Sequence, residues 1–121
     1  MPRTTLSKVA LPTEVGATDG TVITPTPADE PTNHNQFSLT GNEILLVLNT
    51  AASTGTVTVS SKTDRYGRVK DITAVTIPAA VAGMPGMKVF PRFTLEGWQQ
   101  PDGFCYLAAS AVTIWFIVIQ L

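Results

Sequence analysis

Charge is the property that this sequence has least of. Only 14% of its 121 residues are Asp, Glu, Lys or Arg, against about a quarter in an ordinary soluble domain. Ser and Thr replace much of the missing charge, and such a surface is suited to contact with other protein. The net charge of -1 also lacks the excess of Lys and Arg that attracts nucleic acid or anionic membrane. We therefore expect an oligomer or a docked component, with neither nucleic acid nor membrane as its partner.

Residues that carry out chemistry are equally scarce. The single cysteine, Cys105, excludes an internal disulfide, and its aromatic neighbours predict a buried, inert thiol. The single histidine, His34, cannot form a histidine cluster, so we interpret Asp29 and Glu30 beside it as a solvated acidic turn and not as metal ligands. Neither a nucleophile–base signature nor a phosphate-binding glycine motif is present. We therefore expect that the protein is not an enzyme and that it binds neither a cofactor nor a metal ion.

Long apolar runs are also missing. The most hydrophobic stretch, residues 112–121, is about half as long as a membrane-spanning helix requires. The amino-terminal residues contain basic side chains but no apolar segment of signal-peptide length. These features predict neither a transmembrane segment nor a signal peptide.

The clearest periodic pattern lies in residues 41–61. Residues 43–49 are almost continuously apolar, which is typical of a central strand covered on both faces. Between Thr56 and Ser60 apolar and hydroxyl side chains alternate, as in a half-buried strand. Gly55 ends the segment between the two strands, whose residue types favour a turn. The pattern predicts a β-hairpin.

Short strands separated by turn residues make up the rest of the chain. We expect further strands at residues 36–40, 71–77, 87–93, 104–109 and 113–121. Pro91 interrupts the strand at 87–93. The count, about seven or eight strands, and the absence of a convincing helix are typical of all-β domains. The sequence thus predicts a single-domain antiparallel β-sandwich or a jelly-roll-like barrel.

The first 35 residues differ in amino-acid composition from the rest. They are rich in Pro and Thr and poor in large apolar groups, so residues 1–35 are predicted to be an extended amino-terminal arm beside a domain at 36–121. Apolar patches at 9–11 and 22–23 offer short edge strands to this sheet or to a neighbour's. A disordered tail is the alternative.

Two places are candidates for contact with a partner. The first is the loop at 62–71, interpreted either as an ordinary solvated loop, as a docking loop or, least favoured, as a nucleic-acid contact. The second is Trp98, read either as a structural plug under its loop or as an exposed platform. The candidate partner-binding residues are Lys62, Arg65, Tyr66, Arg68, Lys70 and Trp98.

The closing strand is apolar on both faces, so it must be central in its sheet or covered by another subunit. On the second alternative, the candidate subunit-interface residues are Ile114, Trp115, Phe116, Ile117 and Val118.

The segments GNEILLVLNTAASTGTVTVSS, YGRVKDITAVTIPA and WQQPDGFCYLAA, with the closing strand, resemble small β-rich decoration (cement) proteins of tailed-bacteriophage capsids. The resemblance covers residues 36–121. It implies a structural virion protein, assembled in the host cytoplasm as a homotrimer, that binds the outer capsid surface and stabilises it by bridging major capsid protein subunits. Two alternatives stay open: a carbohydrate- or receptor-binding sandwich module, and a head–tail joining or tail component.

Overall fold

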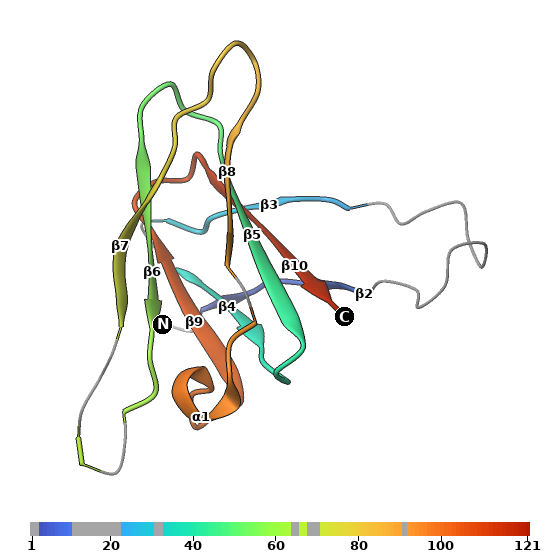
Figure 1. Cartoon of the computed structure of the whole chain (residues 1–121), viewed down its shortest axis with the longest axis vertical. Helices are drawn as coiled ribbons and strands as arrows, with labels where there is room; N and C mark the ends of the chain where they lie inside the picture. The colour runs from blue at the N-terminus through green and yellow to red at the C-terminus, as the bar shows by residue number, and fades with distance from the viewer. Residues whose placement is uncertain (1–2, 11–22, 31–32, 64–65, 68–70, 91) are drawn as a thin grey trace, which may run out of the picture.

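The computed structural model describes residues 3–10, 23–30, 33–63, 66–67, 71–90 and 92–121. These residues form an all-β structure of two packed sheets (Figure 1). The first sheet has the strand order β1-β4-β9-β6-β7. Its strands are β1 (Thr4–Thr5), β4 (Asn35–Ser38), β9 (Phe104–Ala109), β6 (Gly55–Ser60) and β7 (Ile72–Ile77).

The second sheet has the strand order β2-β10-β5-β8, and β3 also pairs with β10. Its strands are β2 (Lys8–Ala10), β10 (Ile114–Gln120), β5 (Glu43–Asn49), β8 (Gly86–Phe90) and β3 (Thr26–Pro27). The one-turn helix α1 (Leu95–Trp98) precedes β9. In the part of the chain that the structure describes, no pairing joins the edge strands β7 and β8, so the sheets do not close into a barrel.

The expectation of a purely antiparallel fold was wrong. β1 runs parallel to β4, and β2 runs parallel to β10, so both sheets are mixed. The sequence contained no signal for this, because β1, β2 and β3 have only two or three residues each and a period cannot be recognised over so short a length. The same three strands raise the number in the described chain from the expected seven or eight to ten.

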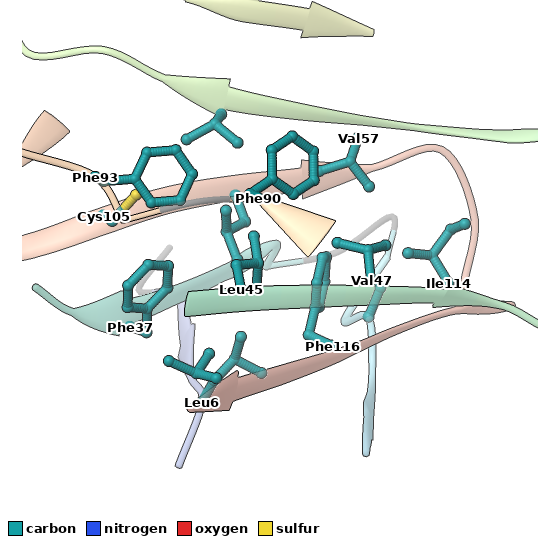
Figure 2. Packing of buried hydrophobic residues seen from close by; sticks show 14 of the residues in the cluster. Leu6, Phe37, Leu45, Val47, Val57, Phe90, Phe93, Cys105, Ile114 and Phe116 are labelled. Carbon is teal, nitrogen blue, oxygen red and sulfur yellow. The ribbon is translucent and has the colours of Figure 1, made fainter. Parts of the chain in front are cut away.

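The core lies between the sheets and is filled by alternate residues of the long strands (Figure 2). On β5 the inward side chains are Glu43, Leu45, Val47 and Asn49, all fully buried. Phe37, Phe93 and Phe116 supply much of the remaining volume. Strict alternation of this kind leaves one whole face of each sheet pointing away from the core.

Described segments before position 36 add strands to the same two sheets and side chains to the same core. Leu6 and Ala28 are almost completely buried in it, and the backbone of Leu6 donates a hydrogen bond to the Gln36 carbonyl. The apolar patch at 9–11 lies in β2 as far as residue 10, whereas Ile23 precedes β3 and belongs to no strand. Residues 11 and 22, at the ends of the two patches, lie outside the described residues. These parts of the amino-terminal segment therefore complete the subunit's own sheets.

Candidate docking surfaces

The outward face of the second sheet is apolar at every strand position. The registers place three rows of side chains on it: Val9, Ile119 and Ile44; Ile117, Leu46 and Val89; Trp115, Leu48 and Met87. We call these nine residues the apolar face. The charged residues of the same strands, Lys8, Glu43 and Lys88, occupy inward positions. A partner that covers this face therefore meets no charge from its strands.

Exposure on the apolar face increases towards the edge strand β8. Ile117, in the middle of the sheet, is only 7% exposed, whereas Met87 and Val89 on β8 are 55% and 59% exposed. With strands about 4.8 Å apart and rows about 6.8 Å apart, each position occupies about 33 Å², so the nine positions cover roughly 300 Å² of flat sheet. The largest apolar patch on a typical soluble monomer is of about this size and is often functional.

The outward face of the first sheet has the opposite character. Thr56, Thr58 and Ser60 of β6 point outward, because Val57 and Val59 between them are fully buried. Their neighbours across the sheet include Thr76 and Tyr106. We call this surface the hydroxyl face. As the sequence predicted, β6 has one apolar and one hydroxyl side.

The predicted subunit-interface residues are divided between the two sides of β10. Ile114, Phe116 and Val118 point into the subunit's own core and are at most 1% exposed, so they cannot contact another subunit without unfolding. Trp115 and Ile117 point outward, into the apolar face. Because β10 lies between β5 and β2, the closing strand is central in its sheet, which was one of the two alternatives.

The predicted partner-binding residues are only partly brought together. The backbone of Lys62 donates a hydrogen bond of 2.7 Å to the carbonyl of Gly97 in α1, which places Lys62 beside the helix that contains Trp98. Tyr66 is exposed. Arg65, Arg68 and Lys70 lie outside the described residues.

Trp98 packs against the core. Its ring meets Phe93 edge to face, with the ring centroids 5.4 Å apart. The side chain is half-buried and borders the buried cluster. Packing of this kind stabilises the end of the sandwich beside α1 and leaves only part of the indole accessible.

A buried ion pair fixes β2 to the second sheet. Nζ of Lys8 lies 2.8 Å from Oε2 of Glu43, whose side chain is fully buried. The Glu43 carboxylate also accepts hydrogen bonds from the backbone and hydroxyl of Thr40, at 2.9 and 2.6 Å. Burial by itself raises the pKa of Glu43, but these hydrogen bonds from Lys8 and Thr40 outweigh it and hold the pKa below its ordinary value.

The acidic turn is more buried than the sequence suggested. Nδ1 of His34 lies 2.6 Å from a carboxylate oxygen of Glu30, which also accepts a hydrogen bond from the backbone of Ala109. The carboxylate of Asp29 accepts hydrogen bonds from Thr4 and Asn33. These groups attach β1 and the β3–β4 turn to the first sheet, because each has a partner within the fold.

The thiol of Cys105 was predicted to be buried and inert, and its burial is confirmed. Burial, and to a lesser degree the negative charge of Glu43, raises the pKa of Cys105 to about 12. A thiol with so high a pKa is not ionised near neutral pH, so it lacks the thiolate that reacts as a nucleophile.

Within the described residues, no group of three or more His, Cys, Asp or Glu side chains is placed to hold a metal ion, and no helix is long and apolar enough to cross a membrane. Comparisons with protein-family models, curated proteins and solved structures found no match.

Sequence reasoning found the two-sided apolar strands β5 and β10 but missed that β8 and β2 extend the same face. From the sequence of β8, where Lys88 lies between Met87 and Val89, the usual prediction is that the lysine side chain points outward. The structure does the reverse: Phe90 belongs to the core, and the period of two then turns Lys88 inward. The useful signal was the buried aromatic residue at the strand's end.

Proposed function

We propose that this protein is a structural component of a virion that binds the outer surface of a phage capsid and performs no catalysis. The observation that carries the proposal is the apolar face, whose nine strand positions hold no charged side chain and, apart from the indole N–H of Trp115, no polar group. Burying apolar surface contributes about 25 cal/mol per Å², so covering this face supplies a driving force for association. The resemblance to capsid decoration proteins supplies the identity of the partner, the major capsid protein.

The size of the apolar face favours assembly over a simple pair. Its flat area of roughly 300 Å² is well under half of the ~800 Å² that each partner contributes to a standard stable interface. Additional surface must therefore take part, either in a second copy of this chain or in the capsid. We propose a homotrimer that bridges capsid subunits. In such a trimer each copy buries part of its surface against the other copies and part against the shell. For the fold we propose a β-sandwich, one of the two architectures that the sequence predicted, because the described sheets do not close into a barrel.

A carbohydrate- or receptor-binding module has less support. Such a module needs accessible aromatic rings on one surface. The guanidinium of Arg3 lies 4.5 Å from the centroid of the Tyr106 ring, and the Tyr106 hydroxyl donates to Asp102. Trp98 packs on Phe93. The rings of Tyr106 and Trp98 are thus both engaged within the subunit, on different elements of the described chain.

Thermal rupture of shells tests the proposal. Empty shells assembled from the major capsid protein of the same virus should rupture at a higher temperature when saturated with this protein, and the increase should depend on its concentration in a saturable manner. A protein that binds only the assembled state stabilises it by about 2.7 kcal/mol per site when its free concentration is a hundred times Kd. Equal rupture temperatures with and without saturating protein would contradict the proposal.

A further inference from the structure

The loop between β7 and β8 contains a small hairpin with an apolar end. Val81 and Met84 exchange two backbone hydrogen bonds, each of 2.9 Å. The two residues between them, Ala82 and Gly83, have φ angles of 52° and 83°, which is the signature of a type I′ turn. We call residues 81–84 the tip hairpin. It protrudes beyond the sheets at one end of the molecule (Figure 1).

The side chains of the tip hairpin are accessible and carry no polar group. Val81 is 71% exposed and Met84 is 67% exposed. Ala82 adopts a left-handed conformation that costs a residue with a Cβ about 1 kcal/mol or more. Asn-Gly forms the same turn at lower cost, but an asparagine would place an amide at the end of the hairpin. Ala-Gly keeps the end apolar at the expense of stability.

The legs of the hairpin are braced by the fold. Gly86 lies so close to Pro78 that a Cβ on it would come within 1.8 Å of the Pro78 carbonyl oxygen. The backbone of Ala80 donates a hydrogen bond of 2.8 Å to the carbonyl of Ala51. Ala51 is held in turn by the side chain of the buried Asn49. A braced hairpin loses little conformational entropy when it binds.

The loops around the tip hairpin share its chemistry. The β5–β6 loop is attached to it through Ala51, and the β9–β10 loop is attached to the β5–β6 loop by a hydrogen bond from Thr50 to the Thr113 carbonyl. No charged residue occurs in loop residues 50–54, 78–85 or 110–113. Val112 is also exposed, and Met87 and Val89 continue the apolar surface onto β8. We call this region the uncharged end.

We propose that the tip hairpin is an anchor that inserts Val81 and Met84 into an uncharged apolar pocket on the capsid protein shell. The inference rests on the proposed function and names the part of the molecule that grips the shell. Buried anchors in well-packed pockets carry most of the energy of many interfaces. The occupied pocket must be uncharged, because no side chain of the uncharged end can pair with a buried charge. A membrane is less favoured, since interfacial segments combine apolar residues with Lys, Arg and Trp, none of which occurs in these three loops.

Co-sedimentation with empty shells of the major capsid protein tests the anchor. In the double variant Val81→Ser and Met84→Ser the turn residues stay in place, and we expect Kd for shells to increase at least tenfold. Ala82→Asn is the sharper variant, because Asn suits the left-handed conformation. It should leave the melting temperature unchanged or higher while weakening shell binding. Ala82→Gly is the matched control, which relieves the strain without adding a polar group and should bind like the wild type.

The results separate this inference from the proposed function. If the wild type binds shells and both polar variants bind equally well, the anchor is overturned and the capsid-binding function stands. If the wild type does not bind shells, both are overturned. Light scattering should give the same molar mass for all variants, and a change would identify the hairpin as a subunit contact instead. Equal binding of the wild type to phosphatidylcholine vesicles, lost in the double variant, would overturn the protein pocket in favour of a lipid surface.

Discussion

The two outward faces of this molecule are built on the same architecture and have opposite chemistry. The hydroxyl face presents Thr and Ser side chains along β6, which water solvates without a partner. The apolar face presents Ile and Leu side chains along β5. Both strands are central in their sheets, so position in the sheet does not explain the contrast. The difference teaches that the apolar face gains more free energy than the hydroxyl face from burial against another protein, because its side chains make no hydrogen bonds to water that burial would break.

The polar groups of the two sheets are also used differently. Across the second sheet they turn inward: Glu43 and Asn49 are fully buried, and each has hydrogen-bond partners. On the hydroxyl face they point to solvent, and only some of them, such as Thr58, bond to the backbone. Stability of the second sheet therefore depends on a few buried polar groups, whereas its outer surface remains available for association.

The largest expected effect comes from removing a buried polar group on the inner side of the second sheet. Glu43→Ala leaves Lys8 without its partner and removes the acceptor for Thr40. Breaking a buried pair in this way costs about 3–5 kcal/mol, so we expect a fall of that size in the free energy of unfolding, measured by urea denaturation. Glu43→Gln should cost less, because the amide oxygen still accepts a hydrogen bond. A change below about 1 kcal/mol for Glu43→Ala would show that β2 is not held by this pair.

The same carboxylate makes stability depend on pH. The pKa of Glu43 is lower in the folded protein than its ordinary value of 4.5, so its contribution is fully present above that value and is lost as the pH falls through the folded pKa. Melting temperatures measured from pH 7 to pH 3 should therefore decline at the acidic end. Glu43→Gln should show a shallower acid decline than the wild type. Parallel curves would assign the acid sensitivity to other carboxylates.

A matched pair of charge substitutions compares the two faces directly. Val89 lies on the edge strand of the apolar face and Thr76 on the edge strand of the hydroxyl face, and both are exposed. Exposed substitutions usually change stability by within about 0.5 kcal/mol, so Val89→Lys and Thr76→Lys should both fold.

Only Val89→Lys should weaken association with shells or between subunits. We expect at least a tenfold loss, equivalent to about 1.4 kcal/mol, because it buries an unpaired charge. Sedimentation velocity and shell binding measure both cases. Equal losses for the two variants would mean that the faces do not differ in function.

The smallest expected effect lies on the hydroxyl face. Oγ1 of Thr58 accepts a hydrogen bond of 3.0 Å from the backbone of Ala74, at the irregularity between β6 and β7. Thr58→Val removes the acceptor, but the exposed N–H can bond to water, so the free energy of unfolding should fall by only about 0.5–1 kcal/mol. Thr56→Val on the same strand is the control. A loss of several kcal/mol would show that this face is structural in the same way as the buried side of the second sheet.

Much of the fold was predictable because long strands produce a clear residue pattern in the sequence. The segments expected at 43–49, 71–77 and 104–109 became β5, β7 and β9, and the end of β8 at Phe90 precedes Pro91. Helix α1 was missed, since a single turn leaves no period. The candidate site was half predictable: the two-sided apolarity of β10 indicated a covered surface, but the residues proposed for it included three that belong to the core.

The amino-acid sequence by itself determined that the protein is all-β, that it is poor in charge and that its two central hydrophobic strands need cover on both sides. These are local properties, set by composition and by a period of two. Only the tertiary structure decided which side of each strand faces the core. That choice depends on register, because pairing β10 between β5 and β2, with Phe90 inside, turns Lys8, Glu43 and Lys88 inward together and leaves one uncharged surface outside. Register is a relation between segments distant in the chain, so no single segment contains it.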